Sequence, residues 1–126
     1  MITYNDWIAR AKSAYKCALV EKDEDIFYED LCYQLQQSVE KALKGLLIYF
    51  GADPEFTHSI SKLIVELKKH TEIPEYIIEA SKLTDYAVET RYPGDYVEIS
   101  KEEYEKAIVI ANDCLNWVEN QIATGK

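Results

Sequence analysis

The chain is poor in residues that interrupt helices, with four glycines and three prolines among 126 residues. Glycine and proline are the least favourable residues inside a helix, so their scarcity suits long helices. No P-loop, dinucleotide-binding, zinc-protease or nucleophile-elbow motif occurs, and the chemistries that depend on them gain no support. The two histidines, His58 and His70, have no cysteines or carboxylates at metal-ligand spacing. We therefore expect no metal site and no cofactor.

Positive charge is also scarce, because 14 Lys and Arg stand against 23 Asp and Glu for a formal net charge of −9. This balance argues against a protein that coats DNA, since neutralising phosphates requires a basic surface. It leaves room for a small basic pocket within an acidic envelope. The first residues lack a signal-peptide pattern, and no apolar stretch is long enough to span a membrane. We expect a cytoplasmic protein that folds as one domain over residues 1–126.

Cys17, Cys32 and Cys114 are an odd number of cysteines without a Cys-x-x-Cys pair. All three lie among apolar residues in helical patterns. The prediction is three buried, reduced thiols that pack as small hydrophobic side chains.

Apolar residues recur at helical spacing along nearly the whole chain, and this pattern predicts five helices and no strand. The helices are expected at about residues 5–21, 25–50, 59–70, 74–90 and 100–123. The second has two apolar faces, which is typical of a central helix or of one that meets a partner. Gly51, and Ser100 with Glu103, are typical helix-end residues. The fold prediction is an all-α, up-and-down antiparallel bundle of four main helices plus a short fifth.

Polar side chains occupy the middle of the long second helix. Gln37, Lys41 and Lys44 share one face, while Gln36, Glu40 and Lys44 form another line. One interpretation is a solvated face with an ion pair between Glu40 and Lys44, four residues apart. The alternative is a groove lined by these groups, because a central helix should not be widely exposed.

Two further polar features lie outside that helix. His58 precedes the third helix, where its side chain could cap exposed amides or contact the neighbouring helix. The turn between the last two helices contains Arg91, Tyr92, Asp95 and Tyr96. Arg91 could bind a phosphate through two hydrogen bonds while the tyrosine rings stack on a base. Alternatively, Arg91 pairs with Asp95 or Glu89 and caps the fourth helix.

Taken in chain order, the helices and the three polar features resemble those of the HEPN domain family over almost the whole chain. The resemblance rests on Trp7 and Ala11, on Gln-Gln-Ser-Val-Glu-Lys-Ala-Leu-Lys-Gly-Leu at 36–46, on Thr57-His58-Ser59-Ile60 and Leu63, and on Arg91-Tyr92-Pro93. It implies an all-α bundle that commonly forms a homodimer, with a groove near the dimer axis and links to nucleotide or RNA binding. Many members are metal-independent ribonucleases, often toxins. Many prokaryotic members are encoded beside a minimal nucleotidyltransferase that acts as antitoxin.

The ribonuclease members carry an arginine followed, after four to six residues, by a histidine. Arg91 matches the arginine, but Tyr96, Val97 and Glu98 occupy the places where the histidine should stand. Tyrosine has a reference pKa of about 10 and transfers protons poorly at neutral pH. Whether the protein is an enzyme is therefore open, and Arg91, His58 and Tyr96 are the candidate catalytic residues.

The first hypothesis is a non-catalytic homodimeric module that binds a nucleotide or RNA beside a nucleotidyltransferase, in a toxin–antitoxin type of system. Its candidate binding residues are Gln37, Glu40, Lys41, Lys44, Arg91, Tyr92 and Asp95. The second is a divergent metal-independent ribonuclease toxin in which Arg91 stabilises the phosphate and His58 or Tyr96 moves the proton. The third is a protein-interaction module that uses a helix face.

Overall fold

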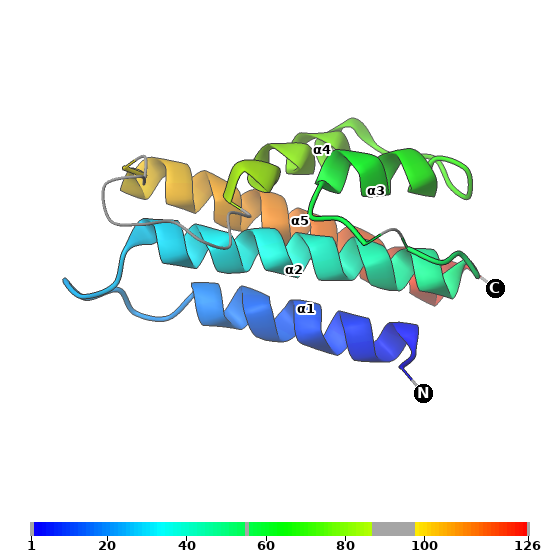
Figure 1. Ribbon diagram of the computed structural model, residues 1–126, viewed down its shortest axis with the longest axis horizontal. Helices are drawn as coiled ribbons and strands as arrows, with labels where there is room; N and C mark the ends of the chain where they lie inside the picture. Colours follow the sequence, from blue (N-terminus) through cyan, green and yellow to red (C-terminus); the bar gives the residue numbers. More distant parts are fainter. Residues whose placement is uncertain (1, 55, 87–97, 126) are drawn as a thin grey trace.

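The computed structural model describes residues 2–54, 56–86 and 98–125, and within these ranges it contains helices and no strand. The elements are α1 (Tyr4–Ala18), α2 (Tyr28–Tyr49), α3 (Ile60–Leu67), α4 (Glu75–Ile78), the 3₁₀ helix η1 (Glu79–Tyr86) and α5 (Lys101–Thr124). Figure 1 shows that α1, α2, the α4–η1 pair and α5 alternate in direction along the bundle. The predicted all-α class is confirmed. In the part of the chain described, no helix combines the length and apolar character needed to cross a membrane.

α2 is the central element of the bundle. It contacts α1, α3, η1 and α5, and in Figure 1 it lies between α1 and the α3–α4 layer. Its side chains Leu35, Leu43, Leu46 and Leu47 are almost completely buried. Burying one such side chain stabilises the fold by about 1.5–3 kcal/mol. The central position expected from its two apolar faces is therefore confirmed.

Small residues bring α1 close to α2. A Cβ atom added to Gly45 would lie 3.0 Å from Cδ1 of Ile8 and 3.1 Å from Cβ of Trp7. On α1, Ala11 and Ala14 are buried. This close approach places the first turns of α1, including Trp7, beside the polar middle of α2.

The predicted helix ends at Gly51 and Ser100 are confirmed. Gly51 has a φ of +83°, and its N–H donates to the carbonyl of Ile48 at 2.9 Å. The N–H of Ala52 donates to the carbonyl of Leu47 at 2.9 Å, which completes a Schellman motif. Ser100 Oγ accepts from the N–H of Glu103 at 3.1 Å. After Gly51 the chain turns back along α2, and this return brings residue 58 to the middle of that helix (Figure 1).

The fourth expected helix, over 74–90, is divided. α4 has only four residues, the chain then continues as η1 to Tyr86, and residues 87–90 lie outside the described ranges. The buried residues Ile77, Ala80 and Leu83 are three apart, which is the repeat of a 3₁₀ helix. Ser81 Oγ also donates to the carbonyl of Ile78 at 2.9 Å, a local bond that competes with α-helical hydrogen bonding.

Other helix ends differ by about one turn from the prediction. α1 ends at Ala18 and α3 at Leu67, each earlier than expected. α2 begins at Tyr28 rather than near residue 25, because the side chain of Asp23 accepts the N–H of Asp25 at 2.8 Å and forms a turn.

One cysteine prediction is wrong. Cys32 and Cys114 are buried free thiols, as expected, but Cys17 is exposed. α1 lies at the edge of the bundle, and its buried residues Ile8, Ala11, Ala14 and Ala18 form a single stripe that excludes position 17. Helical spacing in the sequence did not distinguish the buried stripe of α1 from Cys17, which lies at its border.

Candidate functional site

Polar side chains converge on the carboxylate of Glu40, in the middle of α2. Glu40 is only 4% exposed. Lys44, one turn later, places Nζ 2.8 Å from Oε2, and Gln36, one turn earlier, donates from Nε2 to Oε1 at 2.9 Å. Nδ1 of His58 lies 2.9 Å from Oε1. The line of Gln36, Glu40 and Lys44 therefore contains the expected ion pair but is buried, and it is not the solvated face of the first interpretation.

The electrostatics of this cluster keep Glu40 ionised. Burial is the largest influence and acts to raise the pKa of Glu40. Hydrogen bonds from Lys44, His58 and Gln36, together with the charge of Lys44, outweigh burial, so that the pKa lies below its ordinary value. An ionised carboxylate with a lowered pKa is a poor proton carrier at neutral pH. Glu40 is better suited to fixing the positions of His58 and Lys44.

Aromatic rings border the cluster on its solvent side. Nζ of Lys44 lies 5.9 Å from the ring centroid of Trp7 and 5.8 Å from that of Phe56, within cation–π range. Phe56 is 99% exposed, and the side chain of His58 is 43% exposed. The cluster therefore meets solvent through an imidazole and an aromatic ring. Phe56 was not predicted, because a loop phenylalanine belongs to no periodic pattern.

The segment before α3 is held to α2 by more than the imidazole. Nε2 of Gln36 also approaches the backbone carbonyl of His58 at 3.4 Å, and Oε1 of Gln36 accepts from Nε2 of Gln37 at 2.8 Å. The expectation that His58 contacts the neighbouring helix is confirmed. The cap of α3 is instead Ser59, whose Oγ accepts from the N–H of Lys62 at 3.4 Å.

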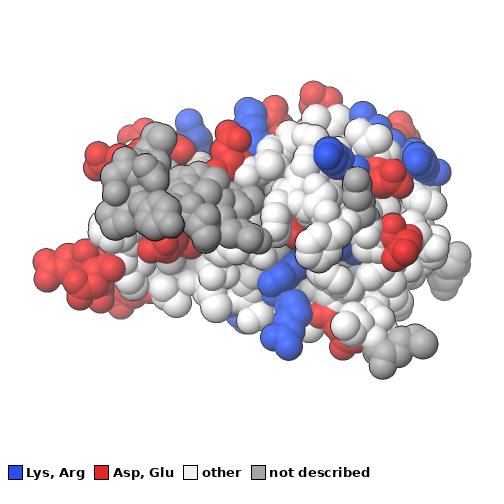
Figure 2. Space-filling view, viewed as in Figure 1, with Lys and Arg blue, Asp and Glu red and all other residues white. Residues whose placement is uncertain are grey.

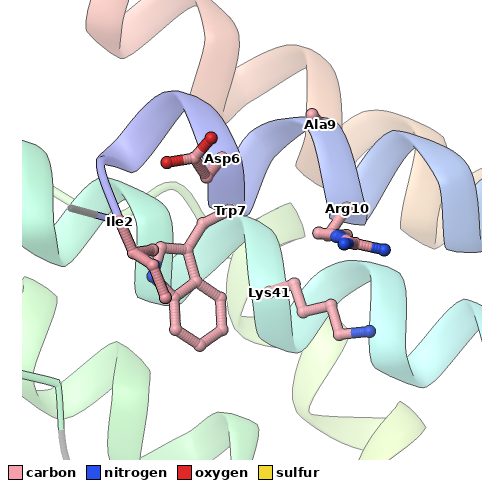
Figure 3. A pocket seen from close by; sticks show the side chains of 6 residues that line it. All are labelled: Ile2, Asp6, Trp7, Ala9, Arg10 and Lys41. Carbon is pink, nitrogen blue, oxygen red and sulfur yellow. The ribbon is translucent and has the colours of Figure 1, made fainter.

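Lys41 lines a groove between α1 and α2 with a volume of about 470 Å³ (Figure 3). Its lining residues are Ile2, Asp6, Trp7, Ala9, Arg10 and Lys41. In Figure 3 the side chains of Arg10 and Lys41 extend in the same direction, while Trp7 lies beside Ile2. Sequence reasoning did not select Arg10, because nothing in the helical pattern distinguishes it from other exposed basic residues.

The rest of the predicted site lies outside the described residues, namely Arg91, Tyr92, Asp95 and Tyr96, as does Glu89. From the predicted set, the structure joins Glu40, Lys44 and His58 directly and links Gln37 to them through Gln36. Lys41 belongs to the adjacent groove. Across residues 2–54, 56–86 and 98–125, no group of three His, Cys, Asp or Glu side chains could hold a metal ion.

Known proteins share both this sequence pattern and this fold. A family model described as "HEPN domain" matches residues 4–121. The chain belongs to the HEPN domain family. The resemblance drawn from the polar run of α2, the Thr-His-Ser segment and Arg-Tyr-Pro is therefore confirmed. No curated protein matches this HEPN domain.

Two solved structures resemble this HEPN domain over nearly their full lengths. The first is TT1696 from Thermus thermophilus, with a TM-score of 0.81 and 30% sequence identity, covering 96% of this chain and 99% of that one. The second is ST0689, described as an archaeal HEPN homologue, with a TM-score of 0.76 and 33% identity, covering 97% and 99%. This chain and the two solved structures therefore share the HEPN fold over nearly the whole chain, not only at the motifs.

Proposed function

We propose that this HEPN domain is a non-catalytic module that binds a nucleotide or a segment of RNA as a homodimer. The observation that carries the proposal is the enclosed carboxylate of Glu40, which fixes His58 and Lys44 beside the exposed ring of Phe56. Burying an ion pair is expensive, and well-packed apolar residues often replace one without loss of stability. A buried carboxylate with three polar partners therefore favours a role in binding over a role in folding.

The chemistry of the surface suits a nucleotide. Phe56 offers a stacking face, and base–aromatic stacking contributes about 1–3 kcal/mol per base. The imidazole of His58 can hydrogen-bond a ribose or phosphate, and Lys44 adds positive charge. Arg91 would bind the phosphate through two hydrogen bonds. A non-catalytic role is consistent with the missing histidine after Arg91.

The proposed partner is a minimal nucleotidyltransferase in a toxin–antitoxin type of system, because many prokaryotic HEPN proteins are encoded beside one. This part of the proposal rests on the family and not on a surface of this chain. A small nucleotidyltransferase gene beside this one, and its product in the purified complex, are the expected findings. A solitary gene and a protein that purifies without a partner would contradict it.

Binding is tested by fluorescence anisotropy with labelled single-stranded RNA and with a labelled mononucleotide. Arg91→Glu should abolish binding, whereas Lys106→Glu, the same charge change at an exposed position of α5, should not. Phe56→Ala should weaken binding about tenfold or more without changing the melting temperature, because the ring is 99% exposed. Unchanged affinity in Arg91→Glu would reject the site assignment.

A second candidate function, a divergent metal-independent ribonuclease, is favoured by one contact. Glu40 holds Nδ1 of His58 at 2.9 Å, and a carboxylate that orients an imidazole is a recurring arrangement in catalytic sites. The 2′-hydroxyl would attack the phosphorus and form a 2′,3′-cyclic phosphate as the bond to the 5′-oxygen breaks. His58 would take part in moving the proton from the 2′-hydroxyl to the departing 5′-oxygen, and Arg91 would stabilise the phosphate. RNA cleavage in chelator that both Arg91→Ala and His58→Ala abolish would establish this function. No cleavage by the parent protein would favour the binding module.

A further inference from the structure

The groove between α1 and α2 combines two cations with an aromatic wall. Arg10 and Lys41 lie side by side at one end of it, and Trp7 lines the other (Figure 3). The lining also holds one acidic residue, Asp6, whose carboxylate accepts the N–H of Thr3 at 2.7 Å and keeps its negative charge. Within the described residues, no ion pair involves Arg10 or Lys41. The lining therefore carries two cations and one carboxylate, a formal excess of one positive charge.

The cations of the groove contrast with the acidic character of the whole protein. The protein carries a formal charge of −9. Figure 2 shows one group of Lys and Arg side chains over α1 and α2 near the middle of this face and others along its upper edge, while a group of Asp and Glu lies at the end that carries the α1–α2 connector. An anionic ligand approaching this face is attracted to the middle and repelled from that end.

Trp7 connects the groove to the Glu40 cluster. Its ring lines the groove and also lies 5.9 Å from Nζ of Lys44, which is bound to Glu40. The two surfaces therefore share a wall at Trp7, and a strand that occupied the cluster could continue into the groove along this ring.

We propose that this groove binds the adjoining nucleotides of a single-stranded RNA, with Arg10 and Lys41 on its phosphates and Trp7 stacked against a base. The inference rests on the proposed function and extends it from one nucleotide to a strand. An acidic peptide would satisfy the two cations but would leave the indole ring without a stacking partner. Single-stranded RNA suits both, because its unpaired bases can stack on aromatic side chains.

The test compares two double variants with the same net charge. Arg10→Gln/Lys41→Gln removes the groove cations, and Lys12→Gln/Lys16→Gln removes two exposed lysines elsewhere on α1. For an RNA of about ten nucleotides, the groove variant should bind about tenfold or more weakly, and the control like the parent. The salt dependence should also fall by about 0.7 in log–log slope for each phosphate that the variant no longer neutralises. A mononucleotide should bind all three proteins equally.

Trp7 itself gives a second measurement. The chain has two tryptophans, so Trp117→Phe leaves Trp7 as the only one. Addition of the RNA should quench its fluorescence through stacking. If the groove variant binds RNA like the parent and Trp7 is not quenched, the groove inference is overturned while the proposed function stands. If the parent binds neither RNA nor mononucleotide, both fall. Displacement of RNA by polyglutamate without quenching would assign the groove to an acidic peptide and overturn the inference.

Discussion

Nδ1 of His58 lies 2.9 Å from Oε1 of Glu40, across 18 positions of sequence. The contact joins the segment before α3 to the middle of α2, so the buried carboxylate of Glu40 helps to position the imidazole. Because Lys44 and Gln36 bind the same carboxylate, the stability of the bundle and the geometry of the candidate site are coupled at this residue.

Glu40→Gln should destabilise the protein by about 3 kcal/mol, because it leaves the buried ammonium of Lys44 without its counter-charge. Urea unfolding of the two proteins at neutral pH measures this loss. The matched control is Glu66→Gln, which removes an exposed carboxylate from its pair with Lys69. Exposed pairs contribute about 0–1 kcal/mol, so the control should unfold almost like the parent. Equal losses in both variants would contradict a special role for Glu40.

The contribution of Glu40 should also depend on pH. Folding lowers its pKa, so its stabilisation is complete above the ordinary pKa of the carboxyl and is lost as the pH falls through the lowered value. The difference in unfolding free energy between the parent and Glu40→Gln should therefore shrink in acid. Urea titrations at a series of pH values give this difference. A gap that stays constant from neutral to strongly acidic pH would show that the charge of Glu40 is not what stabilises the cluster.

Gly45 sets how closely α1 approaches α2, so the effect of its replacement on stability should depend on the size of the new side chain. Gly45→Ala gains about 1 kcal/mol of helix propensity, which offsets the tight contacts of the new Cβ with Ile8 and Trp7. Gly45→Val adds two further methyl groups at this contact and should cost about 1–3 kcal/mol. Asn112→Val, at an exposed position of α5, controls for the helix propensity of valine. A valine variant as stable as the alanine variant would mean that the helices can move apart freely.

The three thiols should differ in reactivity. Cys17 is exposed and should react with an alkylating reagent in the native protein. Burial raises the pKa of Cys32 and of Cys114 to about 12, so both should remain unmodified until the protein unfolds. Mass spectrometry after a timed reaction identifies the modified residue. Rapid native labelling of Cys32 or Cys114 would show that the core opens readily around them.

The long helices, and the helix ends at Gly51 and Ser100, could be predicted because their signals are local. The apolar stripes of α1, α2 and α5, and the end signals at Gly51 and Ser100, depend only on residues a few positions apart. The division between α4 and η1 was missed because the stripe Ile77, Ala80, Leu83 fits an α-helix almost as well as a 3₁₀ helix. The choice between the two helix types depends on contacts with other elements. One such contact is the hydrogen bond in which Oγ1 of Thr84 accepts the N–H of Ile60 at 3.1 Å.

The site divides in the same way. Glu40, Lys44 and His58 could be selected because their residue types recur in the family pattern. That Glu40 is the shared partner of the other two could not be predicted, since it depends on how the chain turns back after α2. Arg10 and Phe56 escaped selection because their position comes from the packing of α1 on α2 and from a loop, and neither leaves a period in the sequence.

The two carboxylate oxygens of Glu40 bind different partners, and His58 is the partner that the carboxylate can exchange. Oε2 receives Lys44, whereas Oε1 receives both Gln36 and His58. If the imidazole turns toward a ligand, the carboxylate keeps an ammonium on one oxygen and an amide on the other, and no buried charge is left bare. Withdrawal of Lys44 would leave the charge uncompensated. The cluster can therefore release its half-exposed member to a phosphate while the charges of the enclosed pair remain compensated.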